Sequence, residues 1–274
     1  MSSSNLKPRD VIIGGSSITN SSPWPTWASW IMKRHASSNF VNTSVKGTGN
    51  EVIILKAIQE AKKYAKPVVI VQLTNVDKWD WYVEHPDLAE KINHERHPLT
   101  KLDTAELSGF WSTGSHFPLW KQYYKENYFG IEYQMFRTLM LIHWFQMFCT
   151  ANQWEHYILF DSPILAVTEQ QLNLGQLTQH ECVSTNLADS TLCQLLFDQI
   201  DFSNIYGPGL IGYAELHNLE WYSVKTKGHP GSLVHYYFAR DIVLPWVDQR
   251  LEATQEFETF EIEAKVMQKL FENY

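Results

Sequence analysis

Three short apolar runs, separated by two helix-like segments, limit what this chain can fold into. The runs are DVIIGG (10–15), NFVNTSV (39–45) and VVIVQL (68–73), and the segments 23–35 and 50–65 carry apolar residues at helical spacing. The third run is almost entirely apolar, which is typical of a parallel strand that helices cover on both faces. The β-α-β-α-β order therefore predicts an α/β fold with an open, doubly wound parallel sheet.

The later part of the chain continues the same alternation. A long apolar stretch at 131–153 predicts a helix, and HYILFD (156–161) predicts a fourth strand. The segment 232–251 predicts a late helix with one apolar face. These elements are predicted to add a fourth strand to the sheet and further helices to the layers that cover it.

Two polar and aromatic stretches interrupt the alternation and are predicted to be insertions. The first, about 76–130, is expected to be partly helical, and the second, about 162–206, contains one predicted helix at 190–199. We therefore predict one α/β domain at 1–252 that carries both insertions, followed by an acidic helical extension at 253–274.

The composition excludes several classes of function. The 274 residues carry a formal net charge of −8, which argues against a nucleic-acid partner because phosphate binding needs clustered Lys and Arg. The longest apolar stretch is interrupted by His143 and Gln146, so no membrane span is expected. The N-terminal segment has no apolar core and does not predict a signal peptide, and the three cysteines form no metal or disulfide pattern.

Four polar segments are expected to meet beyond the carboxyl ends of the strands, where open α/β sheets bind ligands. They contain Ser17, Gly47, the pair Thr74 and Asn75, and His229. A serine hydroxyl, a backbone N–H donor, a polar side-chain donor and an imidazole are the groups needed for acyl transfer through an oxyanion. The pattern thus favours nucleophilic catalysis by Ser17.

The order of these segments resembles the SGNH (GDSL-like) hydrolase superfamily. Gly15-Ser16-Ser17-Ile18-Thr19 is similar to the variant first block G-C-S-F-T of that family, and Gly47 occupies the place of the second-block glycine. The segment 72–75 approximates the third block, and His229-Pro230 matches the second half of the fifth block, D-x-x-H-P. The resemblance covers about half of the chain and implies a flavodoxin-like three-layer α/β/α fold.

The resemblance also implies a reaction. Ser17 would be the nucleophile and His229 the base, while the N–H groups of Ser17 and Gly47 and a donor from Thr74 or Asn75 would form the oxyanion hole. The expected activity is hydrolysis of an ester, such as an O-acetyl group on a glycan, through an acyl-Ser17 intermediate. No cofactor is implied.

One departure from the family pattern concerns the residue that orients the histidine. Thr226 stands where the family carries an aspartate, three residues before His229. Loss of that carboxylate costs about 10⁴ in kcat in a serine protease triad. Asp77, Asp80, Glu220 or a backbone carbonyl are the candidates to replace it.

Simpler interpretations of the same residues remain open. Ser17 could cap the following helix, Asn75 could close an Asx turn, and His235 is expected to pack on the late helix. His94-Glu95-Arg96-His97 lacks the spacing of a zinc site, so no metal is expected.

A second hypothesis belongs to a different class of function. The overall layout is most similar to SGNH-like proteins of tailed bacteriophages, so the chain could be a weak or inactive structural or binding protein of a phage particle. It would be made in the host cytoplasm and contact other virion proteins or further copies of itself. Aromatic residues between Trp79 and Tyr128 are predicted to border the Ser17 pocket, or to form the interface.

Overall fold

The computed structural model describes residues 7–20, 24–46, 48–76, 80–83, 100–101, 110–113, 131–162, 190–220 and 229–272. Its centre is a sheet of five strands in which every neighbouring pair is parallel. The strand order is β2-β1-β3-β7-β8, which is the flavodoxin-like order 2-1-3-4-5. The strands are β1 (Asp10–Gly14), β2 (Asn39–Asn42), β3 (Val68–Leu73), β7 (Glu155–Phe160) and β8 (Ile205–Tyr206).

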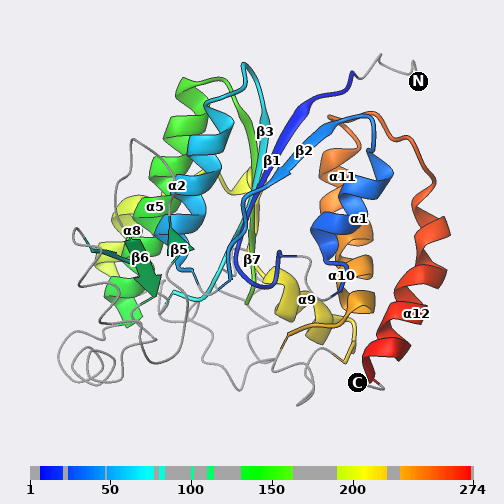
Figure 1. Cartoon of the computed structure of the whole chain (residues 1–274). Coiled ribbons are helices and arrows are strands. Elements are labelled where there is room, and N and C mark those ends of the chain that lie inside the picture. Colours follow the sequence, from blue (N-terminus) through cyan, green and yellow to red (C-terminus); the bar gives the residue numbers. More distant parts are fainter. Residues whose placement is uncertain are drawn as a thin grey trace.

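Helices cover both faces of this sheet, as Figure 1 shows. One layer holds α2 (Asn50–Ala61), α5 (Ile131–Ala151) and α8 (Thr191–Phe197). The other holds α1 (Trp27–Arg34), α10 (Ser232–Phe238) and α11 (Leu244–Val247), with α9 (Gly209–Leu216) near the lower edge of the sheet and α12 (Glu261–Glu272) outside α10. The predicted three-layer α/β/α fold is therefore confirmed.

Alternating residues of each central strand build the two cores. Val11 and Ile13 of β1 join the core under α1 and α10, whereas Ile12 between them joins the core under α2 and α5. The same alternation holds for β3, where Val69 and Val71 face α2 while Val68 and Ile70 face the opposite layer. Because successive side chains point to opposite faces, a strand buried on both sides is apolar at nearly every position.

The helix expected at 232–251 differs from the observed structure near its middle. The predicted late helix is divided by a π-helical turn, η4 (Ala239–Val243), between α10 and α11. Pro245 follows this turn and has no N–H for a regular helical bond, which explains the local change in pitch. Beyond η5 (Phe257–Phe260), helix α12 packs against α10, and Phe257, Phe260 and Ala264 belong to the core of the domain.

The described parts of the two expected insertions contain short strands. β4 (Asp80–Val83), β6 (Phe110–Thr113) and β5 (Thr100–Lys101) form a separate antiparallel sheet that was not expected. The partly helical character predicted for 76–130 stays a prediction, because the rest of that stretch lies outside the described residues. In the second stretch, the short 3-10 helix η3 (Phe202–Asn204) precedes β8, which completes the main sheet beside β7. A strand of two residues is too short to show a periodicity in the sequence.

Candidate functional site

The turn after β1 contains two adjacent serines that differ in burial and in hydrogen bonding. Ser16 is fully buried, and its Oγ donates a hydrogen bond of 2.9 Å to Asp161 Oδ2. Ser17 is half-buried, and among the described residues its side chain has no hydrogen-bond partner. Helix α1 begins after Thr26, so Ser17 is not its N-cap. The side chain of Ser16 is therefore held in place by Asp161, whereas the Ser17 hydroxyl is available to react with a substrate.

Glycine and backbone hydrogen bonds fix the shape of this turn. A Cβ on Gly15 would lie 2.0 Å from Thr19 Oγ1 and 2.5 Å from Thr19 Cβ, so no larger residue fits. The amides of Thr19 and Asn20 both donate to the Ser16 carbonyl at 3.2 Å. The chain therefore folds back on itself directly around Ser17.

A buried glutamine ties the turn to the sheet. Gln72 Oε1 accepts hydrogen bonds of 2.6 Å from Thr19 Oγ1 and from Trp27 Nε1. Its Nε2 donates to the Phe160 carbonyl at 3.3 Å. Gln72 is the one polar residue in the apolar third run, and it joins β3, β7, the Ser17 turn and α1.

The block after β3 contains the two alternative oxyanion donors. Thr74 is buried, and its backbone is held by Asn50, whose Oδ1 accepts from Thr74 N–H at 2.8 Å and whose Nδ2 donates to the Thr74 carbonyl at 3.2 Å. The Thr74 hydroxyl is buried and makes no hydrogen bond to the described residues. Asn75 is exposed. Gly47, the other expected donor, lies outside the described residues.

The second catalytic candidate, His229, comes three residues before α10 in the sequence. In Figure 1 the carboxyl ends of β1, β3 and β7 point to the lower edge of the sheet, where α10 begins. The side chain of His229 is half-buried, and His235 on α10 is buried at 1% exposure. Burial and the nearby His229 charge lower the pKa of His235 to about 3, so His235 is neutral and suited to packing, as expected.

The three acids expected as orienting groups have different positions. Asp80 is buried beside the N-terminus of α2, where its carboxylate accepts from Gly49 N–H at 2.7 Å and Val52 N–H at 2.9 Å. Burial and the charge of Glu51 raise the pKa of Asp80 to about 7. Glu220 is exposed, and Asp77 lies outside the described residues. The Asp80 carboxylate therefore already accepts hydrogen bonds from backbone N–H groups at the start of α2.

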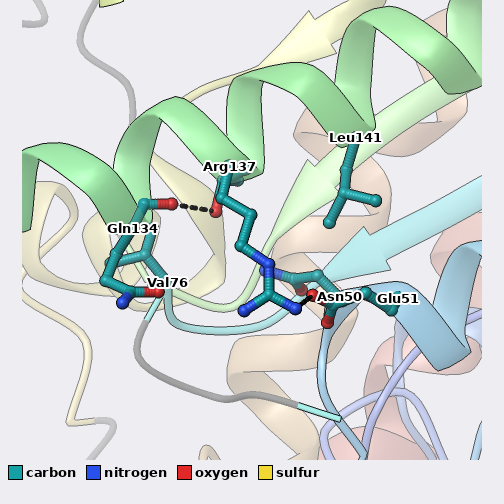
Figure 2. A pocket seen from close by; sticks show the side chains of 7 residues that line it. Asn50, Glu51, Val76, Gln134, Arg137 and Leu141 are labelled. Carbon is teal, nitrogen blue, oxygen red and sulfur yellow. Dashed lines mark hydrogen bonds and ion pairs between the residues drawn. The ribbon is translucent and has the colours of Figure 1, made fainter. Parts of the chain in front are cut away.

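A small pocket lies between α2 and α5, where Asn50, Val76 and Arg137 are among the residues that line it (Figure 2). Arg137 reaches from α5 toward Asn50 and Glu51, and it forms an ion pair with the Glu51 carboxylate. Burial raises the pKa of Glu51, and the Arg137 charge opposes that rise. The pocket volume of about 10 Å³ is near the lower limit for one water molecule, so it is too small for an ester substrate.

Asp161 is the residue of this site that the sequence interpretation missed. It directly follows β7, its backbone N–H donates to the Leu73 carbonyl at 2.8 Å, and its carbonyl accepts from Ile211 N–H at 3.0 Å. The side chain is 2% exposed. The rule that placed Ser17 and Thr74 at the carboxyl edge applies equally to Asp161, so its position was available from the sequence.

Neither a known family model nor a curated protein matches the sequence of this chain. Among the described residues, no helix is both long and apolar enough to cross a membrane, and no group of three or more His, Cys, Asp or Glu side chains is arranged to hold a metal ion. The segment His94–His97 and the side chains of the aromatic residues between Trp79 and Tyr128 fall outside this description, so the predicted aromatic border of the Ser17 pocket stays a prediction.

Proposed function

We propose that the protein is a serine ester hydrolase in which Ser17 is the nucleophile and His229 the base, similar to SGNH hydrolases. The observation that carries the proposal is the contrast at the β1 turn: Ser16 is buried and bonded, whereas Ser17 is accessible and unbonded among the described residues. This turn lies at the carboxyl edge of a central strand in a sheet of order 2-1-3-4-5, the usual place for a ligand in such folds.

The proposed reaction proceeds in two halves. Ser17 Oγ attacks the ester carbonyl while His229 takes the hydroxyl proton, and the oxyanion is bound by the N–H groups of Ser17 and Gly47. Collapse of this intermediate expels the alcohol, which receives the proton from His229. Water then attacks the acyl-Ser17 with His229 again as base, which releases the carboxylic acid and the free Ser17 hydroxyl. An O-acetylated glycan is the substrate that we propose.

A covalent probe tests the nucleophile directly. The intact protein is incubated with a fluorophosphonate, and the modified peptide is identified by mass spectrometry. The proposal predicts one phosphonylated serine, Ser17, and no modification of Ser16. Labelling of another serine, or none in a protein shown to be folded by circular dichroism, would refute it.

The third oxyanion donor can be assigned by comparing Thr74 with Asn75. The buried Thr74 hydroxyl without a described partner supports Thr74, because such groups are uncommon unless a ligand or water uses them. We expect Thr74→Val to lower kcat for p-nitrophenyl acetate by about 10²-fold with little change in KM. Asn75→Ala is the matched control and should change kcat less than about threefold; the reverse result would assign the role to Asn75.

A second candidate function, a structural or binding protein without catalysis, is favoured by an exposed apolar stripe. Tyr133, Met140, Trp144 and Met147 of α5 are 51%, 41%, 42% and 57% exposed. Their spacing places them on one face of the helix. Leu195 of the neighbouring α8 is 64% exposed. Contiguous exposed apolar side chains are typical of protein contacts.

This second proposal predicts self-association through the stripe. The double substitution W144E/M147E should shift the protein from a dimer to a monomer in size-exclusion chromatography with light scattering, because two charges would be buried in the interface. Val266→Glu places a charge at an exposed apolar position of α12, on the other side of the sheet, and should leave the dimer intact. A wild-type protein that is monomeric at high concentration would exclude the stripe as a self-interface.

A further inference from the structure

The bonded pair Ser16–Asp161 joins the Ser17 turn to the centre of the sheet. Both side chains are buried, at 0% and 2% exposure, and the bond connects residues 145 positions apart in the sequence. A hydrogen bond to a carboxylate is stronger than a bond between neutral groups, and its loss inside the protein is costly. A buried carboxylate at the ligand-binding edge of such a sheet needs an explanation, and the reaction steps given above do not use Asp161.

The backbone of Asp161 is itself held from two sides. Its N–H donates to Leu73 at the end of β3, and its carbonyl accepts from Ile211 in the first turn of α9. Gly209, at the start of that helix, has φ +69°, and a Cβ there would lie 2.8 Å from the Phe160 carbonyl oxygen and 2.7 Å from that of Ser162. The close approach of α9 to the end of β7 therefore fixes the position from which the Asp161 carboxylate points to Ser16.

Ser16 in turn holds the residues that follow it in the turn through hydrogen bonds. Its carbonyl accepts from the amides of Thr19 and Asn20, and its Oγ also lies 3.4 Å from the Ile18 N–H that donates to it. These three hydrogen bonds between residues of the turn all include Ser16. If Ser16 moves, the Ser17 hydroxyl and the Ser17 N–H move with it.

We infer that Asp161 is a positioning residue: through its hydrogen bond to Ser16 it holds the turn that presents the Ser17 hydroxyl and N–H to a substrate. The inference rests on the proposed function for its catalytic consequence. It assigns the geometry of the turn to a carboxylate that directly follows β7, a strand distant in sequence, and not to the local Gly15–Thr19 packing alone.

The test combines a reaction rate with a measurement that needs no reaction. Fluorophosphonate labelling rates are compared for wild type, Ser16→Ala, Asp161→Ala and the double variant, and hydrogen exchange is followed at the Thr19 and Asn20 amides. Asp161→Asn is included because it keeps an acceptor for Ser16 and nearly the same volume. Gln146→Ala is the control, since it removes another buried polar side chain, one that bonds to the Asp201 backbone, from the α5 layer.

We expect Ser16→Ala and Asp161→Ala each to slow labelling by about 10- to 100-fold, with no further loss in the double variant, because both remove one restraint. The Thr19 and Asn20 amides should exchange faster in both, Asp161→Asn should retain most of the rate, and Gln146→Ala should label like wild type. Wild-type labelling in Asp161→Ala, or losses that multiply in the double variant, would overturn the inference. If wild type takes up no probe, the proposed function fails, and unchanged exchange in Asp161→Ala would still overturn the positioning role.

Discussion

Ser17→Ala is expected to lower the rate of ester hydrolysis by about 10³-fold or more, and His229→Ala is expected to lower it by a similar factor. Both residues act in the same step, one as nucleophile and the other as its base, so either loss removes the whole covalent route. The double variant should therefore be no slower than either single variant. The measurement is kcat for p-nitrophenyl acetate, with the unfolding midpoint recorded for each protein.

Asn20→Ala is the control for this comparison because Asn20 lies in the same turn and, among the described residues, its side chain bonds to the Ser44 carbonyl alone, at 3.2 Å. It should retain the rate within about threefold. Multiplicative losses in the double variant would mean that Ser17 and His229 act independently. An unchanged rate in Ser17→Ala would exclude Ser17 as the nucleophile. It would favour the second candidate function, that of a structural or binding protein.

The sequence predicted the central strands β1 and β3 well because they are buried on both faces. A run such as Val68–Leu73 must be apolar at nearly every position, and this signal survives without any relative for comparison. The strand pair β4 and β6 escaped prediction because its residues, DWYV and FWST, show neither a continuous apolar run nor a clear alternation. Their pairing depends on partners distant in the sequence.

Only the site residues that directly follow a strand could be predicted from the sequence. Ser17 and Thr74 follow recognisable strands, and so does Asp161, yet no local pattern shows that Asp161 bonds to Ser16. Asn50 and Gln72 were equally hidden, because their role is to hold backbone and side-chain groups of neighbouring elements. The long-range bonds that shape a site are formed by the fold and cannot be inferred from residue spacing.

His235 is expected to make the protein markedly less stable in acid. Its folded-state pKa lies at about 3, below the ordinary value of 6.5, because burial and the neighbouring His229 charge disfavour the protonated form. Its Nδ1 is buried without a hydrogen-bond partner among the described residues, so a proton there would gain no acceptor. The unfolded chain, in contrast, binds that proton readily at pH 6 and below.

The sign of the effect follows from proton linkage. Between pH 6.5 and about 3 the unfolded state binds more protons at His235 than the folded state, so stability falls as the pH falls. The slope is about 1.4 kcal/mol per pH unit, on the order of 5 kcal/mol over the whole window. We expect His235→Leu to lose this dependence, which urea unfolding at pH 8, 6.5, 5.5 and 4.5 would show as a difference from wild type that grows in acid.

Asp80 supplies a control with the opposite sign. Its folded-state pKa of about 7 lies above the ordinary value of 3.8, so the folded state binds the extra proton and gains stability as the pH falls through this window. Because the two contributions oppose each other, the wild-type curve alone cannot separate them. Relative to wild type, Asp80→Asn should become less stable as the pH falls while His235→Leu becomes more stable. Parallel curves for wild type and His235→Leu would show that His235 is solvated or bonded in the folded protein, and would contradict the buried, neutral imidazole beside His229.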